Sequence, residues 1–181
     1  MVRTLSDLEL AQQAAAGDRG AIELLLARHY DLIYRIAVKW AGNQTDGQDI
    51  AQNACLKLVT VLPKYEGRAR FTTWLYRVVI NVAHDWHRKE TRHQHMAEID
   101  DALLPPNMSD TPEARAEARQ ILGAVQTLPK PEKDALMLVV SEGMSHAEAA
   151  AICKVKEGTI SWRIHEARKK LKALANDGVP A

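Results

Sequence analysis

Cysteine is scarce in this sequence, and the two that occur, Cys55 and Cys153, lie far apart and form no C-x-x-C pair. Structural zinc sites use closely spaced thiolates, and disulfide-built domains use many cysteines. The cysteine content therefore argues against a disulfide scaffold and against a thiolate zinc site. It favours a reducing, cytoplasmic setting.

Long apolar runs are also lacking. The first stretch, MVRTLSDLELAQQ, has no apolar segment of the kind found in signal peptides, and no window approaches the roughly 20 residues of a membrane-spanning helix. We therefore expect a cytoplasmic protein with no membrane insertion.

The common signatures of catalysis are missing as well. The sequence has no glycine-rich phosphate loop, no nucleophile elbow and no paired carboxylates in an apolar setting. His84, His87, His93 and His95 lie close together in the sequence, but no H-E-x-x-H pattern, glutamate partner or cysteine at ligand spacing accompanies them. We expect no enzymatic activity, no metal and no cofactor.

Strand patterns are nearly absent, whereas apolar residues recur at helical spacing along most of the chain. This periodicity predicts helices over residues 22–41, 50–62, 71–88, 114–128, 132–140, 146–153 and 159–174. Ser145 followed by Glu148 is a capping box, which fixes the start of the helix at 146. The predicted fold class is all-α.

A linker is predicted between two domains. The stretch ALLPPNMSDTPEAR is rich in turn-forming residues, and its Pro-Pro pair cannot lie inside a helix. We therefore predict two helical domains, residues 1–95 and 113–181, joined by a flexible linker over residues 96–112.

Charge is unevenly distributed, although the net charge is only +1. Residues 64–92 carry about +4 and residues 154–172 about +5, whereas residues 98–118 carry about −5. Two basic patches on either side of an acidic segment indicate nucleic-acid binding by both domains. Solvated helix faces are the simpler alternative for either patch alone.

The last two predicted helices form a helix-turn-helix, and this places the second of them in the DNA major groove. Alanines at 147, 149, 150 and 151 permit a close helix crossing. On the second helix the predicted buried stripe is Ile160, Ile164, Ala167, Leu171 and Leu174, and the opposite face carries Ser161, Trp162, His165, Lys169 and Lys172. We predict that this face meets DNA, with a protein contact as the alternative.

The helix predicted over residues 71–88 carries a second polar side. Its predicted buried stripe is Phe71, Leu75, Val78 and Val82, with Trp74 and Trp86 at the edges, and Arg77, Asn81, His84 and Arg88 follow one another along another side. The loop before it contains Lys64, Arg68 and Arg70. Cations beside aromatic rings and a flexible loop suit the capture of an unpaired base, whereas Trp74 and Trp86 are more simply core residues.

Three segments, in this order, resemble the extracytoplasmic-function type of bacterial RNA polymerase sigma factor, of the sigma-70 family. DIAQNACLKL and FTTWLYRVVINVAHDWHRK resemble the second conserved region of that family, and LPKPEKDALMLVVSEGMSHAEAAAICKVKEGTISWRIHEARKKL resembles the fourth. The resemblance covers nearly all of the chain. It implies an alternative sigma factor that binds core polymerase, recognises minus-35 and minus-10 promoter elements and promotes DNA melting.

The resemblance also implies roles for single residues. The polymerase-binding residues are Asp49, Gln52 and Asn53, and the minus-10 residues are Lys64, Arg68, Arg70, Thr73, Arg77 and Asn81, with His84, Arg88 and Lys89 as further expected DNA contacts. The minus-35 residues are Lys156, Thr159, Ser161, Arg163, His165, Arg168 and Lys169, with Trp162 on the same face. Whether Trp162 and Glu166 contact bases is left open.

The implied partners are the polymerase core, promoter DNA and an anti-sigma protein. Two other readings stay open at this point. One is a helix-turn-helix regulator whose N-terminal domain binds a protein or ligand, and the other is a sigma-like adaptor that sequesters a regulatory partner. A sigma factor would need core polymerase to select a promoter, whereas a conventional regulator would bind duplex DNA unaided.

Overall fold

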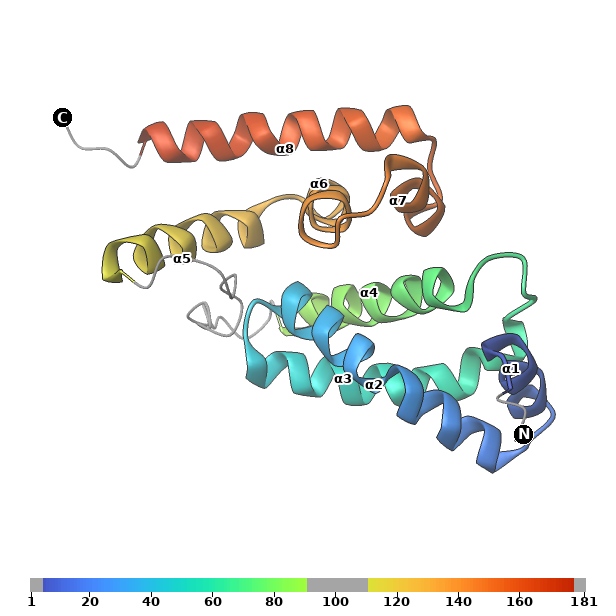
Figure 1. Cartoon of the computed structure of the whole chain (residues 1–181). Helices are drawn as coiled ribbons and strands as arrows, with labels where there is room; N and C mark the ends of the chain where they lie inside the picture. Colours follow the sequence, from blue (N-terminus) through green and yellow to red (C-terminus); the bar gives the residue numbers. More distant parts are fainter. Residues whose placement is uncertain (1–4, 91–110, 178–181) are drawn as a thin grey trace. The chain divides into compact units, whose positions relative to one another are not determined.

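The computed structural model describes residues 5–90 and 111–177, and all regular structure in these two stretches is helical (Figure 1). The predicted all-α class is confirmed. The chain divides into two compact units, Met1–Met96 and Ala97–Ala181. His93, His95 and residues 96–110 of the predicted linker lie outside the described residues.

The described residues of the N-terminal unit form four helices and a short 3-10 turn. They are α1 (Asp7–Ala15), α2 (Arg19–Ala41), α3 (Gln44–Val61), η1 (Leu62–Lys64) and α4 (Phe71–Glu90). Helix α2 packs against α1, α3 and α4, and α3 also packs against α4. The core therefore centres on α2, whose Leu25, Ile33, Ile36 and Trp40 are fully buried.

Local signals in the sequence set the ends of these helices. Ser6 and Glu9 form a capping box at the start of α1, a helix that the periodicity had not predicted. Gly42 adopts a left-handed conformation that ends α2, and the Asn43 side chain then caps α3. A Cβ atom on Gly47 would lie 2.5 Å from Val38 Cγ2, so the close approach of α2 and α3 requires glycine there.

The predicted buried stripe of α4 is partly wrong. Phe71 and Leu75 are buried as predicted, but Val78 and Val82 are only half-buried. The stripe continues instead through Tyr76, Val79, Ile80 and Ala83. Because both α2 and α3 pack on α4, the buried face is broader than one stripe and is turned toward these residues.

The far end of α4 is tied to the end of α2. The His87 ring nitrogen Nε2 lies 3.0 Å from the backbone oxygen of Trp40, in the last turn of α2. The last carbonyl groups of a helix have no partner within the helix. His87 therefore satisfies one of these groups and holds the two helix ends together.

The described part of the C-terminal unit contains α5 (Pro112–Thr127), α6 (Lys130–Leu136), a π-helical turn labelled η3 (Met137–Ser141), α7 (His146–Cys153) and α8 (Glu157–Asp177). Helix α8 packs against α5, α6 and α7. The capping box of Ser145 and Glu148 is confirmed at the start of α7. Among the described residues, no helix is long and apolar enough to cross a bilayer.

The predicted apolar stripe of α8 is confirmed in its first half. Ile160, Ile164 and Ala167 are buried, Leu171 is half-buried and Leu174 is 47% exposed. Helix α8 packs against α6 and α7, and the cover of its stripe decreases after Ala167. The apolar stripe in the sequence alone could not predict at which residue of α8 the burial ends.

Candidate nucleic-acid interface

One side of α4 carries the predicted polar stripe. Its members recur every three or four residues, away from the buried face: Thr73, Arg77, Asn81, His84 and Arg88. Asn81 and Arg88 are exposed, as is Lys89 beyond them, whereas Thr73, Arg77 and His84 are half-buried. Arg88 pairs with Asp85 across one helical turn at 2.6 Å. The stripe therefore combines cations with groups that can form hydrogen bonds.

The segment before α4, residues 65–70, presents exposed cations. Lys64, at the end of η1, is exposed, and so are Arg68 and Arg70. Arg68 pairs with Glu66 at 2.6 Å, but both side chains lie mostly in solvent. Such a pair contributes little to stability. A phosphate group can therefore replace Glu66 at small cost.

Aromatic rings support this segment from the inside. The ring of Tyr65 lies 5.3 Å from Phe71 and 5.1 Å from Trp74, measured between ring centroids. Burial, with a smaller contribution from the Asp7 charge, raises the pKa of Tyr65. Its hydroxyl therefore stays protonated and donates a hydrogen bond to the Ala69 oxygen at 2.8 Å.

The two tryptophans of α4 lie at the border of the core, as expected. Trp74 is half-buried within the ring cluster, 5.6 Å from Phe71. Trp86 is half-buried near the other end of α4, where its ring meets His87 edge-on at 5.8 Å. Each ring thus packs on one side and leaves part of its surface in solvent.

The outer side of α3 carries the residues predicted to bind polymerase. Asp49, Gln52 and Asn53 are all exposed. Leu56, which is 65% exposed, and Val59 continue the same side at helical spacing. These two apolar residues were not among the predicted polymerase contacts. Their signal was a leucine and a valine that fall outside the buried stripe of Ile50, Ala54 and Leu58.

Most of the residues predicted to face DNA on and just before α8 are exposed. Ser161, Trp162, His165, Arg168 and Lys169 are exposed, as is Lys156 just before the helix, whereas Thr159 and Arg163 are half-buried. Trp162 is 59% exposed, which is unusual for a large aromatic ring. The face therefore combines basic groups with one apolar ring.

A hydrogen bond that the sequence did not reveal joins the two helices of the helix-turn-helix. His146 Nδ1 of α7 lies 2.9 Å from Ser161 Oγ of α8. The Ser161 hydroxyl also donates to the Glu157 backbone oxygen at 3.3 Å. Both contacts fix the position of the exposed Ser161 hydroxyl.

The turn between the two helices passes through Lys154, which has a left-handed φ of 56°.

An ion pair links helix α6 to the flank of α8. The buried Glu132 carboxylate accepts a hydrogen bond from Lys170 Nζ at 2.7 Å. The neighbouring Lys133 is also buried, and its ammonium group donates to Gln126 Oε1 of α5. Burial lowers the pKa of Lys133 to about 8, although the charge of Asp134 opposes this effect. These contacts tie α8 to α6 and α6 to α5.

In the described part of the chain, no three histidine, cysteine or carboxylate side chains gather as metal ligands would. His84 and His87 are both half-buried on α4. The other two histidines of the sequence cluster, His93 and His95, lie outside the described residues.

Known families and proteins match both units. The family model described as Sigma-70 region 2 matches residues 25–93, and that described as Sigma-70 region 4 matches residues 118–171. The ECF RNA polymerase sigma factor SigM of Mycobacterium tuberculosis is 30% identical over 169 residues, which cover 93% of this chain and 84% of SigM. SigE of Mycolicibacterium smegmatis, also an ECF sigma factor, is 31% identical over 166 residues, which cover 87% of this chain but only 64% of SigE.

A solved structure is similar along nearly the whole chain. CnrH, in complex with the cytosolic domain of CnrY, is 26% identical and has a TM-score of 0.65, covering 96% of this chain and 99% of CnrH. The sequence matches and this shared fold agree with the order of the two regions, one on each helical unit. The chain therefore belongs to the ECF family of RNA polymerase sigma factors.

Proposed function

We propose that this chain is an alternative sigma factor, which binds core RNA polymerase in the cytoplasm and directs initiation at promoters with minus-35 and minus-10 elements. The observation that carries the proposal is a basic, hydrogen-bonding surface on each matched unit, one along α4 and its preceding segment and one along α8. Catalysis belongs to the polymerase in this proposal.

Helix α8 would read the minus-35 element in the major groove. Its partner α7 braces it, as the first helix of a helix-turn-helix does. Arg168 and Lys169 are suited to phosphate contacts, whereas the exposed ring of Trp162 is suited to an apolar contact with a thymine methyl group. Ser161 is held by His146 and contributes less to base reading.

The segment 65–70 and the stripe of α4 would act on the minus-10 element. Extruding a base from the duplex costs a few kcal/mol, and a protein recovers this cost through stacking and phosphate contacts. Lys64, Arg68 and Arg70 are the phosphate contacts in this proposal. Thr73, Arg77 and Asn81 would face the bases of the melted strand.

The outer side of α3 would bind core polymerase. Asp49, Gln52 and Asn53 are the polar contacts expected from the family resemblance. We add the exposed Leu56 and Val59, because the centre of a protein interface is usually apolar and its rim polar.

An inhibitory protein of the anti-sigma class completes the proposal. The similar protein CnrH is found in complex with the cytosolic domain of CnrY. By this likeness we expect a protein partner that occupies the chain when it is not bound to polymerase.

Run-off transcription tests the proposed function. Purified chain, core polymerase and a library of genomic fragments should yield discrete transcripts that neither protein produces alone. The sequences upstream of their start sites then define both promoter elements. Specific binding to duplex DNA without core, combined with no transcripts, would instead establish the helix-turn-helix regulator.

A further inference from the structure

Helix α1 lies outside both matched segments, since the region 2 match begins at residue 25. It nevertheless packs against α2 and against η1, which leads into residues 65–70. Its first turn carries Asp7 and Leu8, which face different parts of the unit. These two residues connect α1 to the segment that we propose captures the unpaired base.

Leu8 makes the apolar part of this connection. Gly67 has a left-handed φ of +70°, and a Cβ atom built on it would lie 2.8 Å from Leu8 Cδ1. The leucine side chain therefore lies directly over the backbone of the segment. Leu8 is still 41% exposed, which means that it adds little to the core.

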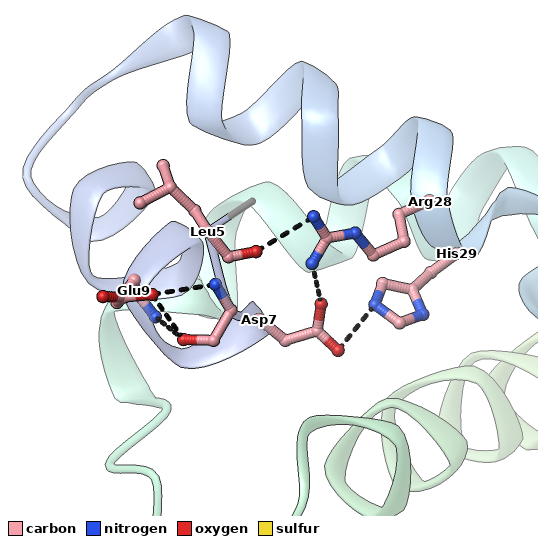
Figure 2. Close-up of polar contacts among 6 residues, drawn as sticks. Leu5, Asp7, Glu9, Arg28 and His29 are labelled. Atoms are coloured by element: carbon pink, nitrogen blue, oxygen red, sulfur yellow. Dashed lines mark hydrogen bonds and ion pairs between the residues drawn. The ribbon is translucent and has the colours of Figure 1, made fainter. Parts of the chain in front are cut away.

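Asp7 makes the polar part of the connection between α1 and the rest of the unit, as Figure 2 shows. Its carboxylate accepts a hydrogen bond from Arg28 Nη1 at 2.6 Å and pairs with His29 Nε2 at 3.0 Å. Arg28 also donates through Nη2 to the Leu5 backbone oxygen at 3.1 Å. Partial burial raises the pKa of Asp7, but the hydrogen bonds and charges of Arg28 and His29 outweigh it and leave that pKa below its ordinary value.

Aromatic contacts continue this connection into the segment. The His29 ring lies 5.0 Å from Phe71, and Phe71 lies 5.3 Å from Tyr65. Tyr65 in turn closes the segment through its hydrogen bond to Ala69. A continuous series of contacts thus runs from Asp7 through His29, Phe71 and Tyr65 to Ala69, while Arg68 and Arg70 stay exposed.

We propose that α1 braces residues 65–70, with Asp7 and Leu8 as positioning residues that hold this segment in the shape needed to capture a minus-10 base. The inference rests on the proposed function, because it assigns α1 a role in that DNA contact. A segment that is ordered before binding loses less conformational entropy on binding. Removal of the brace should weaken single-strand binding about tenfold.

The first experiment measures the brace without DNA. Amide hydrogen exchange is followed in the full chain for wild type, Leu8→Ala and Leu24→Ala. Leu24 is a matched control, because it is an exposed leucine on α2, 56% exposed, which stands in none of the contacts above. We expect faster exchange at residues 65–70 in Leu8→Ala only.

The second experiment measures the DNA contact. The chain is assembled with core polymerase, and the probe is a fluorescent single strand that carries the nontemplate minus-10 sequence of a promoter recovered by run-off transcription. Leu8→Ala and Asp7→Asn should each bind this strand about tenfold more weakly than wild type or Leu24→Ala. Assembly with core should not change, and Leu8→Met, which keeps the volume and apolar character of the side chain, should restore binding.

Three results would overturn the proposal. The first is an exchange rate at residues 65–70 of Leu8→Ala that equals that of wild type. The second is wild-type affinity for the strand in both Leu8→Ala and Asp7→Asn. The third is an equal loss of strand binding and of core assembly in these variants, with no recovery in Leu8→Met. Failure of the proposed function would give a different result. The wild-type chain would then yield no transcripts with core polymerase, while the exchange at residues 65–70 would still be faster in Leu8→Ala than in wild type.

Discussion

Trp162 exposes a large apolar ring on an otherwise basic helix face, and this ring has a clear experimental signature. Replacing it with alanine should lower the affinity for a duplex minus-35 site by about 1 kcal/mol, because an apolar contact with a thymine methyl is lost. The salt dependence should not change, since tryptophan carries no charge. Fluorescence anisotropy of holoenzyme on labelled duplex at several salt concentrations measures both quantities.

Arg168 on the same helix is the matched comparison for Trp162. Arg168→Ala should weaken binding to all duplexes and reduce the salt slope by about 1, as expected when one phosphate contact is lost. If Trp162→Ala altered the salt slope in the same way, the ring would not be making the apolar contact that we expect.

Lys133 makes the stability of the C-terminal unit depend on pH. Its folded pKa of about 8 lies below its ordinary value of 10.5. Between these two values the unfolded chain holds a proton that the folded chain has released, so the free energy of unfolding rises with pH. The full effect is at most about 3 kcal/mol. Below pH 8 the lysine is charged in both states and its burial is a constant cost.

Urea denaturation of wild type and Lys133→Met, followed by circular dichroism at pH 7 to 10, checks this expectation. As the pH increases above 8, the free energy of unfolding of wild type should increase relative to that of Lys133→Met. Parallel pH profiles would show that Lys133 keeps an ordinary pKa.

Single residues show which structural features can be predicted from the sequence and which cannot. The capping box at Ser145 was predictable because it needs only a serine and a glutamate three positions apart. The same pattern at Ser6 and Glu9 could have revealed α1 in advance. The bond between His146 and Ser161 could not be predicted, because it depends on how α7 and α8 cross.

At the scale of elements, the two sides of α8 carry neighbouring lysines with different expected effects. Lys170→Ala should destabilise the C-terminal unit by about 2 kcal/mol, because it leaves the buried Glu132 carboxylate without its cation. Lys169→Ala should change stability by less than about 0.5 kcal/mol but weaken duplex binding, because Lys169 is exposed on the side of α8 opposite its buried stripe. Urea denaturation and anisotropy of both variants separate the two effects. Equal losses of stability would contradict the assignment.

The two long helices that we propose contact DNA, α4 and α8, were not equally predictable. The start of α8 followed the expected stripe, since Ile160, Ile164 and Ala167 are buried where α8 packs against the rest of its unit. On α4 the stripe was misplaced onto Val78 and Val82, because two helices pack on it from different directions. The polar side of α4 nevertheless lies opposite the buried face, although only Asn81 and Arg88 of its five members are exposed.

At the scale of the whole molecule, the proposed function requires both units in one chain. Joining two modest binding sites raises the effective concentration of the second once the first is bound. Residues 1–96 and 97–181, expressed as separate chains and mixed with core, should therefore lose promoter-specific transcripts. Run-off transcription at equal concentrations of intact and divided protein measures the loss. Full activity of the divided protein would show that the covalent connection is unnecessary.

The hydrogen bond between His87 and the Trp40 carbonyl has a mechanical consequence. In the proposed function, a pull on the chain beyond Glu90 would act first on the last turn of α4. His87 would transmit part of this force to the end of α2, about 25 Å along the α4 axis from Phe71. The end of α4 that we propose captures a base would then receive less of the force that originates in the other unit.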